Sequence, residues 1–413
     1  MSGTVNADSS VYYQTGYWND LPPVQRYLNR RATGDPDLSW SEHLAGYHGG
    51  AFGKALVLNC GNGWVERELV KAGLVAEAVG VDFSADLLGR AREEADRLGL
   101  PLRYAELDTN SAQWPEGDFD LVVNYAAGHH IAYLDRVFRS IAEILPPDGT
   151  LVSWDYVGPH RNQYPAAQWE AAWELNRSLP DGFGHAEMIY PHLPTMLATD
   201  PTEAIHSELI LPIMRRYFEL DHLRALGGGL AYPVLTFNTR LFAQPRADSD
   251  PVVERVLAAD GAYTDRDPAR RTLFCYAVAR PRKASLADVG QLAAWTAEED
   301  ERERHAAANG GRYQPDTLLG GLYDALDQAR REAEHARQPV AVTDPPDLAA
   351  EPTPGLGPEP TAEPTAGPTA GPTPEPTGLL ARLRAGPRVR AVAARVPGAR
   401  PAARWLRRRP ARR

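Results

Sequence analysis

The segment from residue 54 to 83 constrains the fold most, because it reads as a strand, a glycine turn, a helix and a second strand. A short apolar run over 55–58 ends in the turn Asn59-Cys60-Gly61-Asn62-Gly63. The two glycines let the backbone approach a ligand closely, and apolar residues at helical spacing predict a helix over 64–72. The N–H groups at the start of that helix favour electron-rich ligand groups. The segment therefore predicts a pocket for a nucleotide-type cofactor.

The residues after the turn distinguish between two kinds of cofactor. A second strand over 79–82 ends in Asp82, close to the ~20-residue offset from Gly63 at which an acid binds ribose hydroxyls. Dinucleotide-binding folds need a third glycine three residues after Gly63, but Glu66 stands there. A pyrophosphate would also gain little from the neighbouring Glu66 and Glu68, whereas S-adenosylmethionine (SAM) carries no phosphate. These residues favour SAM.

The segment resembles the first two motifs of class I SAM-dependent methyltransferases, and the likeness covers roughly residues 11–283. The phrases LNCGNGWVERELVKAGL, LDTN, AAGHHI and WDYVGPHRNQY are most similar to a bacterial group whose members often accompany glycan and secondary-metabolite genes. The resemblance implies an α/β fold with a doubly wound, Rossmann-like seven-stranded methyltransferase sheet and added helices. It implies SAM as cofactor and a small-molecule or glycan acceptor, methylated at oxygen.

Two residues of the turn depart from the pattern of that family. Val57 stands where the usual motif has an acid, and Asn59 stands where it has a glycine. Asparagine tolerates the left-handed backbone better than most residues, so the turn can keep its shape. The missing acid deprives the methionine amino group of the cofactor of one partner. An alternative function is therefore a SAM-fold binding or scaffold protein with weak or lost catalysis.

Alternating strand and helix patterns continue along the chain and predict a parallel, doubly wound sheet with ligands at the carboxyl ends of its strands. Further strands are expected over 102–107, 119–125, 150–156, 217–223 and 273–279, and helices over 84–98 and 134–145. Amphipathic segments are expected over 165–179 and 201–211, and the apolar stretch 227–244 suits either a pocket wall or core.

The resemblance also assigns residues to the cofactor. Asp108 takes the position that accepts a hydrogen bond from the adenine amino group, with a turn-forming aspartate as the alternative. Asn124 and Tyr125, at the end of a strand, are expected near the methionine part, where an aromatic ring suits a sulfonium. The full predicted cofactor set is Asn59, Cys60, Gly61, Asn62, Gly63, Asp82, Phe83, Asp108, Thr109, Asn124 and Tyr125.

Methyl transfer from a sulfonium is an in-line displacement that needs positioning and one base. The candidates at the predicted strand ends are His129, His130 and Asp155, and more loosely His160 with Tyr156. Histidine suits an alcohol acceptor because its unperturbed pKa of about 6.5 lets it accept a proton near neutrality. The alternative is that one of the two adjacent histidines donates to the backbone and has only a structural role.

Six segments divide the chain. Aromatic residues crowd residues 1–50, which are expected to be a helical segment that either packs on the sheet or covers the cofactor. The others are a SAM-binding core at 51–160, the rest of the sheet with the acceptor region at 161–283, a helical extension at 284–340, a Pro/Thr-rich disordered linker at 341–378 and an Arg-rich basic tail at 379–413.

Cysteine content and hydropathy bear on location. The two cysteines, Cys60 and Cys275, predict a reducing compartment, and no spacing typical of a metal site is present. The start of the sequence has no basic-then-apolar signal, and no apolar run approaches the ~20 residues that span a bilayer. These features predict a cytoplasmic protein.

The basic tail has a distinct charge. It carries 12 arginines and no aspartate, glutamate or lysine, so it carries +12 against −10 for the whole chain, and the other 378 residues carry −22. Such a tail suits peripheral contact with an anionic membrane, here its inner face, or with the acidic body of the chain. A nucleic-acid substrate is disfavoured because the acidic body would repel phosphates. The oligomeric state has no signature in the sequence.

Overall fold

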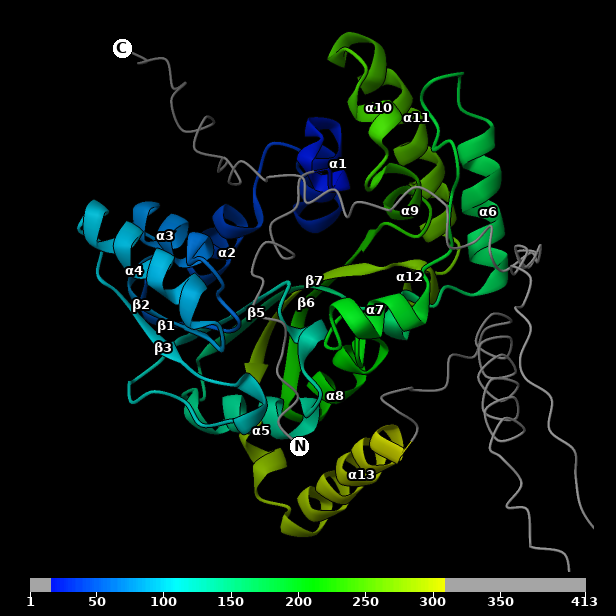
Figure 1. Cartoon of the computed structure of the whole chain (residues 1–413). Helices are drawn as coiled ribbons and strands as arrows, with labels where there is room; N and C mark the ends of the chain where they lie inside the picture. Colours follow the sequence, from blue (N-terminus) through cyan, green and yellow to red (C-terminus); the bar gives the residue numbers. More distant parts are fainter. Residues whose placement is uncertain (1–15, 309–413) are drawn as a thin grey trace, which may run out of the picture. The chain divides into compact units, whose positions relative to one another are not determined.

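The computed structural model describes residues 16–308 (Figure 1). The linker 341–378, the basic tail 379–413 and the helical extension beyond residue 308 lie outside these residues, as do residues 1–15 of the N-terminal segment. No helix within 16–308 combines the length and the apolar character needed to span a bilayer. Cys60 and Cys275 are both buried free thiols.

Seven strands form one sheet in the order β3-β2-β1-β4-β5-β7-β6. They are β1 Phe52–Val57, β2 Val75–Asp82, β3 Leu102–Glu106, β4 Leu121–Tyr125, β5 Thr150–Tyr156, β6 Phe218–Gly227 and β7 Phe274–Pro281. β7 runs antiparallel to both of its neighbours, and the other pairs are parallel. The predicted doubly wound, seven-stranded fold is confirmed, but the expectation of a parallel sheet is wrong at one edge, where the antiparallel β7 makes the sheet mixed. The strand order reverses between β1 and β4, where such sheets bind ligands at the carboxyl edge.

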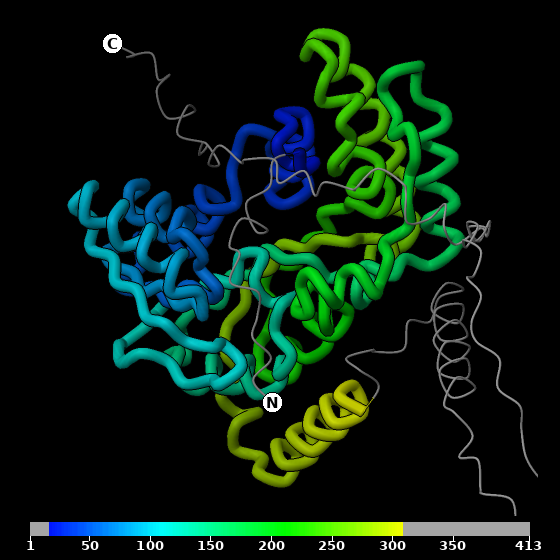
Figure 2. Tube along the Cα trace, in the orientation of Figure 1, coloured from blue at the N-terminus to red at the C-terminus, as the bar shows by residue number. Residues whose placement is uncertain are grey.

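Thirteen α-helices accompany the sheet within the described residues. They are α1 Pro22–Thr33, α2 Trp40–His48, α3 Trp64–Lys71, α4 Ala85–Leu98, α5 Leu134–Ile144, α6 Ala166–Arg177, α7 Leu193–Thr199, α8 Ile210–Tyr217, α9 Ala231–Leu235, α10 Thr239–Phe242, α11 Arg246–Thr264, α12 Pro268–Arg271 and α13 Val289–Ala308. The tube in Figure 2 follows this order from blue to yellow.

The two faces of the sheet bury different helices because side chains alternate along each strand. Ala55 and Val57 of β1 join a cluster with residues of α1, α2, α3, α6, α9 and α11. Leu56, between them, joins a cluster with residues of α5, α8 and α13. This alternation sandwiches the sheet between two helical layers and leaves its carboxyl edge to loops.

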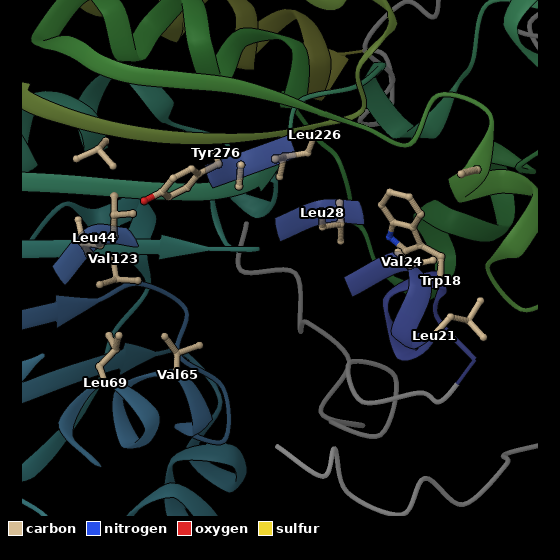
Figure 3. Close-up of a cluster of buried hydrophobic side chains, with 14 of the residues drawn as sticks. Trp18, Leu21, Val24, Leu28, Leu44, Val65, Leu69, Val123, Leu226 and Tyr276 are labelled. Atoms are coloured by element: carbon tan, nitrogen blue, oxygen red, sulfur yellow. The ribbon is translucent and has the colours of Figure 1, made fainter. Parts of the chain in front are cut away.

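The N-terminal segment packs on the late strands of the sheet. Trp18 is 3% exposed and stacks on Phe274 of β7, with ring centroids 5.4 Å apart. Figure 3 shows Leu21, Val24 and Leu28 in the same apolar cluster as Trp18. These residues therefore pack on the sheet, which is the first of the two roles expected for the N-terminal segment. Whether it also covers the cofactor stays a prediction.

Local sequence signals place the helices around the cofactor edge. Gly63 has φ 74° and begins α3, as the glycine turn predicts. The Ser84 hydroxyl accepts a hydrogen bond from Leu87 N and begins α4, which ends at left-handed Gly99. α6 occupies the predicted amphipathic segment 165–179.

The predicted amphipathic segment 201–211 is mostly not helical. Turns occupy 201–206, a 3₁₀ helix covers Ser207–Leu209, and α8 begins at Ile210. Partners from elsewhere hold the backbone of this segment: the Arg161 guanidinium donates to Pro201 O at 2.6 Å and to Glu203 O at 3.0 Å. These long-range hydrogen bonds replace those of a local helix.

Candidate functional site

The turn after β1 has a backbone that few residue types adopt. Asn59, Gly61 and Gly63 have φ of 42°, 57° and 74°. A Cβ at Gly63 would collide with the Tyr104 hydroxyl. Cys60 N donates to Val81 O at 2.9 Å, which joins the turn to β2. The turn is therefore a fixed, glycine-dependent loop at the N-terminus of α3, with Asn62 beside it.

The unusual Asn59 has a structural use that glycine could not supply. Its Nδ2 donates to Ala127 O at 3.2 Å, and its Oδ1 accepts a 2.5 Å hydrogen bond from the Thr109 hydroxyl. Thr109 is 3% exposed. Asn59 thus connects the loop after β1 to the loops after β3 and β4, so that three loops at the carboxyl edge are held together.

Asp82 lies where β2 meets the glycine turn. Its Oδ2 accepts from Gly61 N and its Oδ1 from Ser84 N, both at 2.8 Å. Burial raises the pKa of this carboxyl group, while the backbone N–H donors oppose that shift. Asp82 therefore holds the turn in place, and its contact with a ribose stays a prediction. The neighbouring Phe83 is 41% exposed at the same edge.

Asp108 has the turn-forming role that the sequence left open. Its Oδ1 accepts from Asn110 N at 2.9 Å and from Asn110 Nδ2 at 3.0 Å, so it begins the 3₁₀ helix Thr109–Ser111. Asn110 Oδ1 in turn accepts from Ala132 N and Tyr133 N. These bonds connect the loop after β3 to the loop before α5. A contact between Asp108 and adenine remains untested.

The end of β4 contributes one polar and one aromatic residue. Asn124 is 1% exposed, and its Nδ2 donates to Ser153 Oγ at 2.9 Å and to Asp155 Oδ2 at 2.8 Å. Its Oδ1 is buried and accepts no hydrogen bond from the described residues. Tyr125 packs between Trp40 and Trp64, at centroid distances of 5.6 and 5.1 Å, and burial raises its pKa to about 12. Tyr125 is therefore a neutral phenol beside the glycine turn.

Asp155, at the end of β5, is surrounded by donors. Its Oδ1 accepts from His129 Nδ1 at 2.6 Å and from Tyr156 N at 2.8 Å. Its Oδ2 accepts from Asn124 Nδ2 at 2.8 Å and from Gly128 N at 2.7 Å. Four donors therefore hold a carboxylate that is 1% exposed. This geometry orients the carboxylate towards His129 and disfavours Asp155 as the base, whose identity stays a prediction.

The two adjacent histidines lie on the 3₁₀ helix Gly128–His130 and face one carboxylate. The Nε2 atoms of His129 and His130 each lie 3.8 Å from Glu203 Oε2. Burial alone would lower the pKa of His129, but the carboxylates of Asp155, Glu203 and Asp200 outweigh it and raise the pKa to about 9. Burial and the neighbouring His129 lower the pKa of His130. We call His129, His130 and Glu203 the strand-end cluster.

The sequence did not identify Glu203. It lies in the turns between α7 and α8, and no spacing relates it to the histidines. Ile205 N donates to His129 O at 3.0 Å, which brings its loop onto the histidines. The looser pair does not join the cluster: His160 Nε2 lies 3.2 Å from Glu208, and the Tyr156 hydroxyl donates to Pro159 O.

A surface hollow of about 460 Å³ lies elsewhere, beside α6. Trp173, Arg177, His185 and Arg240 contribute to its lining, and no residue of the strand-end cluster does. This hollow is open and polar, so the carboxyl ends of the strands are the better candidate for the catalytic site.

Comparison with known proteins locates a family match on the same strands. Residues 56–153 match the family described as "Methyltransferase domain". The chain is 28% identical over 151 residues to a demethylmenaquinone methyltransferase of Thermus thermophilus, covering 36% of this chain and 67% of that protein. It is 33% identical over 99 residues to a ubiquinone biosynthesis O-methyltransferase of Methylococcus capsulatus, covering 24% of this chain and 41% of that protein. The second match thus spans less than half of its relative.

Solved structures also align with the chain. The [4+2]-cyclase SpnF aligns with a TM-score of 0.37 and 17% identity, covering 64% of this chain and 86% of that one. A SAM-dependent methyltransferase from Mesorhizobium loti aligns with a TM-score of 0.35 and 18% identity, covering 56% and 91%. The fold is assigned from the strand order and not from these alignments.

Proposed function

Because residues 56–153 form a class I SAM-dependent methyltransferase domain, with SAM as its cofactor, we propose that the whole protein methylates an oxygen of a small-molecule or glycan acceptor. Oxygen is supported by the strand-end histidines and by the name of the O-methyltransferase relative. We also propose that the protein belongs to the bacterial group whose members often accompany glycan and secondary-metabolite genes. SAM supplies an electrophilic methyl group on a sulfonium sulfur.

The residues at the carboxyl edge fit SAM. The turn 59–63 has positive φ at Asn59, Gly61 and Gly63, a backbone that can approach a ligand closely. Asn124 Oδ1 is a buried acceptor with no partner among the described residues, so it suits the amino group that Val57 leaves without an acid. Asp82 and Phe83 lie at the edge where ribose and adenine are expected.

The observation that carries the proposal is the His129–Asp155 hydrogen bond of 2.6 Å at the carboxyl ends of β4 and β5. A carboxylate on Nδ1 fixes the orientation of the imidazole and directs Nε2 away from Asp155. An acceptor hydroxyl at the strand-end cluster would thus lie near the Nε2 atoms of both histidines, and His130, whose pKa is lowered, is neutral and able to take up its proton. Such proton transfer typically contributes ~10²-fold or more to rate.

An extract of a strain that lacks the gene is the best source of unmethylated acceptor. Incubating it with the full chain and SAM labelled on the methyl group should produce a labelled compound heavier by one methylene than its precursor. SAM binding is measured in parallel by calorimetry. Asp82→Ala should weaken it roughly ten-fold or more, because losing a charged acceptor costs ~1.5–3 kcal/mol.

Two outcomes would contradict parts of the proposal. SAM binding without any labelled product would favour the alternative of a binding or scaffold protein. An unchanged isotherm for folded Asp82→Ala would remove the ribose assignment. Label on nitrogen, carbon or sulfur of the product would remove the assignment of oxygen and keep methyl transfer.

A further inference from the structure

We propose that the strand-end cluster binds a divalent transition-metal ion of the zinc type, which holds the acceptor's hydroxyl oxygen during transfer. The inference rests on the proposed methyl transfer to oxygen, and it assigns the deprotonation of the acceptor to the ion in place of an imidazole. The sequence predicted no metal site, because its ligands come from two loops with no motif spacing between them. The structure brings His129, His130 and Glu203 together, with one ligand atom from each and all three atoms within 4.8 Å of one another.

The distances suit a shared ion better than direct hydrogen bonds. Each histidine Nε2 lies 3.8 Å from Glu203 Oε2, which is too long for a hydrogen bond. Two ligand atoms on one tetrahedral zinc ion lie roughly 3.4 Å apart when each bond is about 2.1 Å. A shift of a few tenths of an ångström would bring each Nε2 to that distance from Glu203 Oε2, and the three ligand atoms lie within 4.8 Å of one another.

Hydrogen bonds on the far side of each ring favour the tautomer that a metal requires. His129 Nδ1 faces Asp155 Oδ1, a carboxylate oxygen that only accepts. His130 Nδ1 lies 3.0 Å from Thr202 Oγ1, whose one proton goes to Asp200 Oδ1 at 2.6 Å. A neutral ring at either position would therefore carry its proton on Nδ1 and direct its Nε2 lone pair towards Glu203. Binding of a cation would release the second proton of His129, whose pKa the nearby carboxylates raise. Metal-binding histidines almost always have such a partner on the other nitrogen.

The third ligand is held by its own loop. Asn162 Nδ2 donates to Glu203 Oε1 at 3.3 Å, on the oxygen that does not face the histidines. Arg161 donates to the main chain of Glu203, and Ile205 N donates to His129 O. The loop and the 3₁₀ helix are thus fastened to each other, which fixes the ligands in a stable relative position.

Charge and donor type decide which ion fits. The carboxylates of Asp155, Asp200 and Glu203 lie within 3.9 Å of the two imidazoles, and together they carry three formal negative charges. A divalent cation balances most of that charge. Two imidazoles and one carboxylate form a typical catalytic zinc site with an open fourth position. Mg²⁺ and Ca²⁺ prefer oxygen ligands and fit this set less well.

The ion would activate the acceptor without any change of its own charge. A hydroxyl bound to such an ion has a lowered pKa, so its O–H bond breaks and the proton leaves to solvent. The oxygen's electron pair then forms the bond to the methyl carbon, and the carbon–sulfur bond breaks with its pair left on sulfur. The ion would thus replace an imidazole as the means of deprotonating the acceptor.

The test uses the full chain after chelator treatment and titrates it with Co²⁺, whose visible absorption reports tetrahedral coordination by nitrogen and oxygen. Glu203→Gln removes a ligand at nearly constant shape, and Glu208→Gln is the matched control on the following 3₁₀ helix. Thr202→Val removes the acceptor from His130 Nδ1 and retains all three ligands. SAM binding on each sample checks that the variant is folded.

Wild type and Glu208→Gln should bind about one Co²⁺ per chain, Thr202→Val about ten-fold more weakly and Glu203→Gln at least about 100-fold more weakly. Equal Co²⁺ binding by wild type and Glu203→Gln would overturn the inference. Absence of Co²⁺ binding with full methyl transfer after chelation would also overturn it and leave the proposed function intact. Co²⁺ bound at the cluster in a protein that transfers no methyl group would support the site and remove the proposed function.

Discussion

Asp155→Asn is the substitution whose effect the structure specifies best. The carboxylate accepts two hydrogen bonds on each oxygen, from His129 Nδ1 and Tyr156 N on one side and from Asn124 Nδ2 and Gly128 N on the other. An asparagine keeps one oxygen and places an NH₂ group where the second stood. In either orientation of the amide, its NH₂ group therefore faces two buried N–H donors and cannot accept their hydrogen bonds.

The loss is large because the site is buried. Hydrogen bonds to a charged group contribute about 1.5–3 kcal/mol each, and breaking a buried pair costs about 3–5 kcal/mol. We expect the free energy of unfolding in urea to fall by about 3–5 kcal/mol. The control is Asp148→Asn on the exposed turn before β5, which should change it by less than ~0.5 kcal/mol.

A double-mutant cycle isolates the His129–Asp155 bond. His129→Ala should cost less stability in the Asp155→Asn background than in the wild type, with a coupling energy of about 1.5–3 kcal/mol. Strict additivity, or a loss in Asp155→Asn no larger than in Asp148→Asn, would refute the view that Asp155 positions the imidazole.

Three further predictions concern the loops and the last helix. Gly63→Ala should destabilise more than Gly73→Ala in thermal unfolding, because both glycines are left-handed but only Gly63 has atoms against its Cβ position. Asp260→Ala should cost about 3 kcal/mol or more in urea unfolding, since Asp260 accepts from Tyr27 and three backbone N–H groups. Burial raises the pKa of Glu299 to about 7. Its contribution to the free energy of unfolding is therefore full below about pH 4.5 and is lost as the pH rises through about 7. Glu299→Gln should remove this part of the pH dependence of the free energy of unfolding.

The sequence predicted the sheet well because its signals are local. The glycine turn, the Ser84 cap and Gly99 each depend on a few neighbouring residues, and the helices they begin or end lie where expected. The strand β5 has the predicted bounds 150–156, because turn residues on both sides of an apolar run define where the strand begins and ends. Alternation of strands and helices then restricts the topology to a few arrangements.

The site was harder to predict because its contacts are long-range. Asn59 was identified as a departure from the motif, but its bonds to Thr109 and Ala127 depend on three loops meeting. Glu203 comes from a segment that the sequence described only as amphipathic, and hydrogen bonds from Arg161 hold the main chain of that segment in turns. The four hydrogen-bond donors around Asp155, which disfavour its predicted role as base, come from separate segments and could not be inferred from sequence spacing.

The most direct test of the strand-end site compares His129→Ala with wild type in single-turnover methyl transfer and in SAM binding. Our account predicts SAM affinity nearly equal to that of the wild type and a transfer rate lower by ~10² or more, because the variant keeps the cofactor loop and loses the group at the acceptor. A folded His129→Ala protein that transfers methyl groups at the full rate would contradict it.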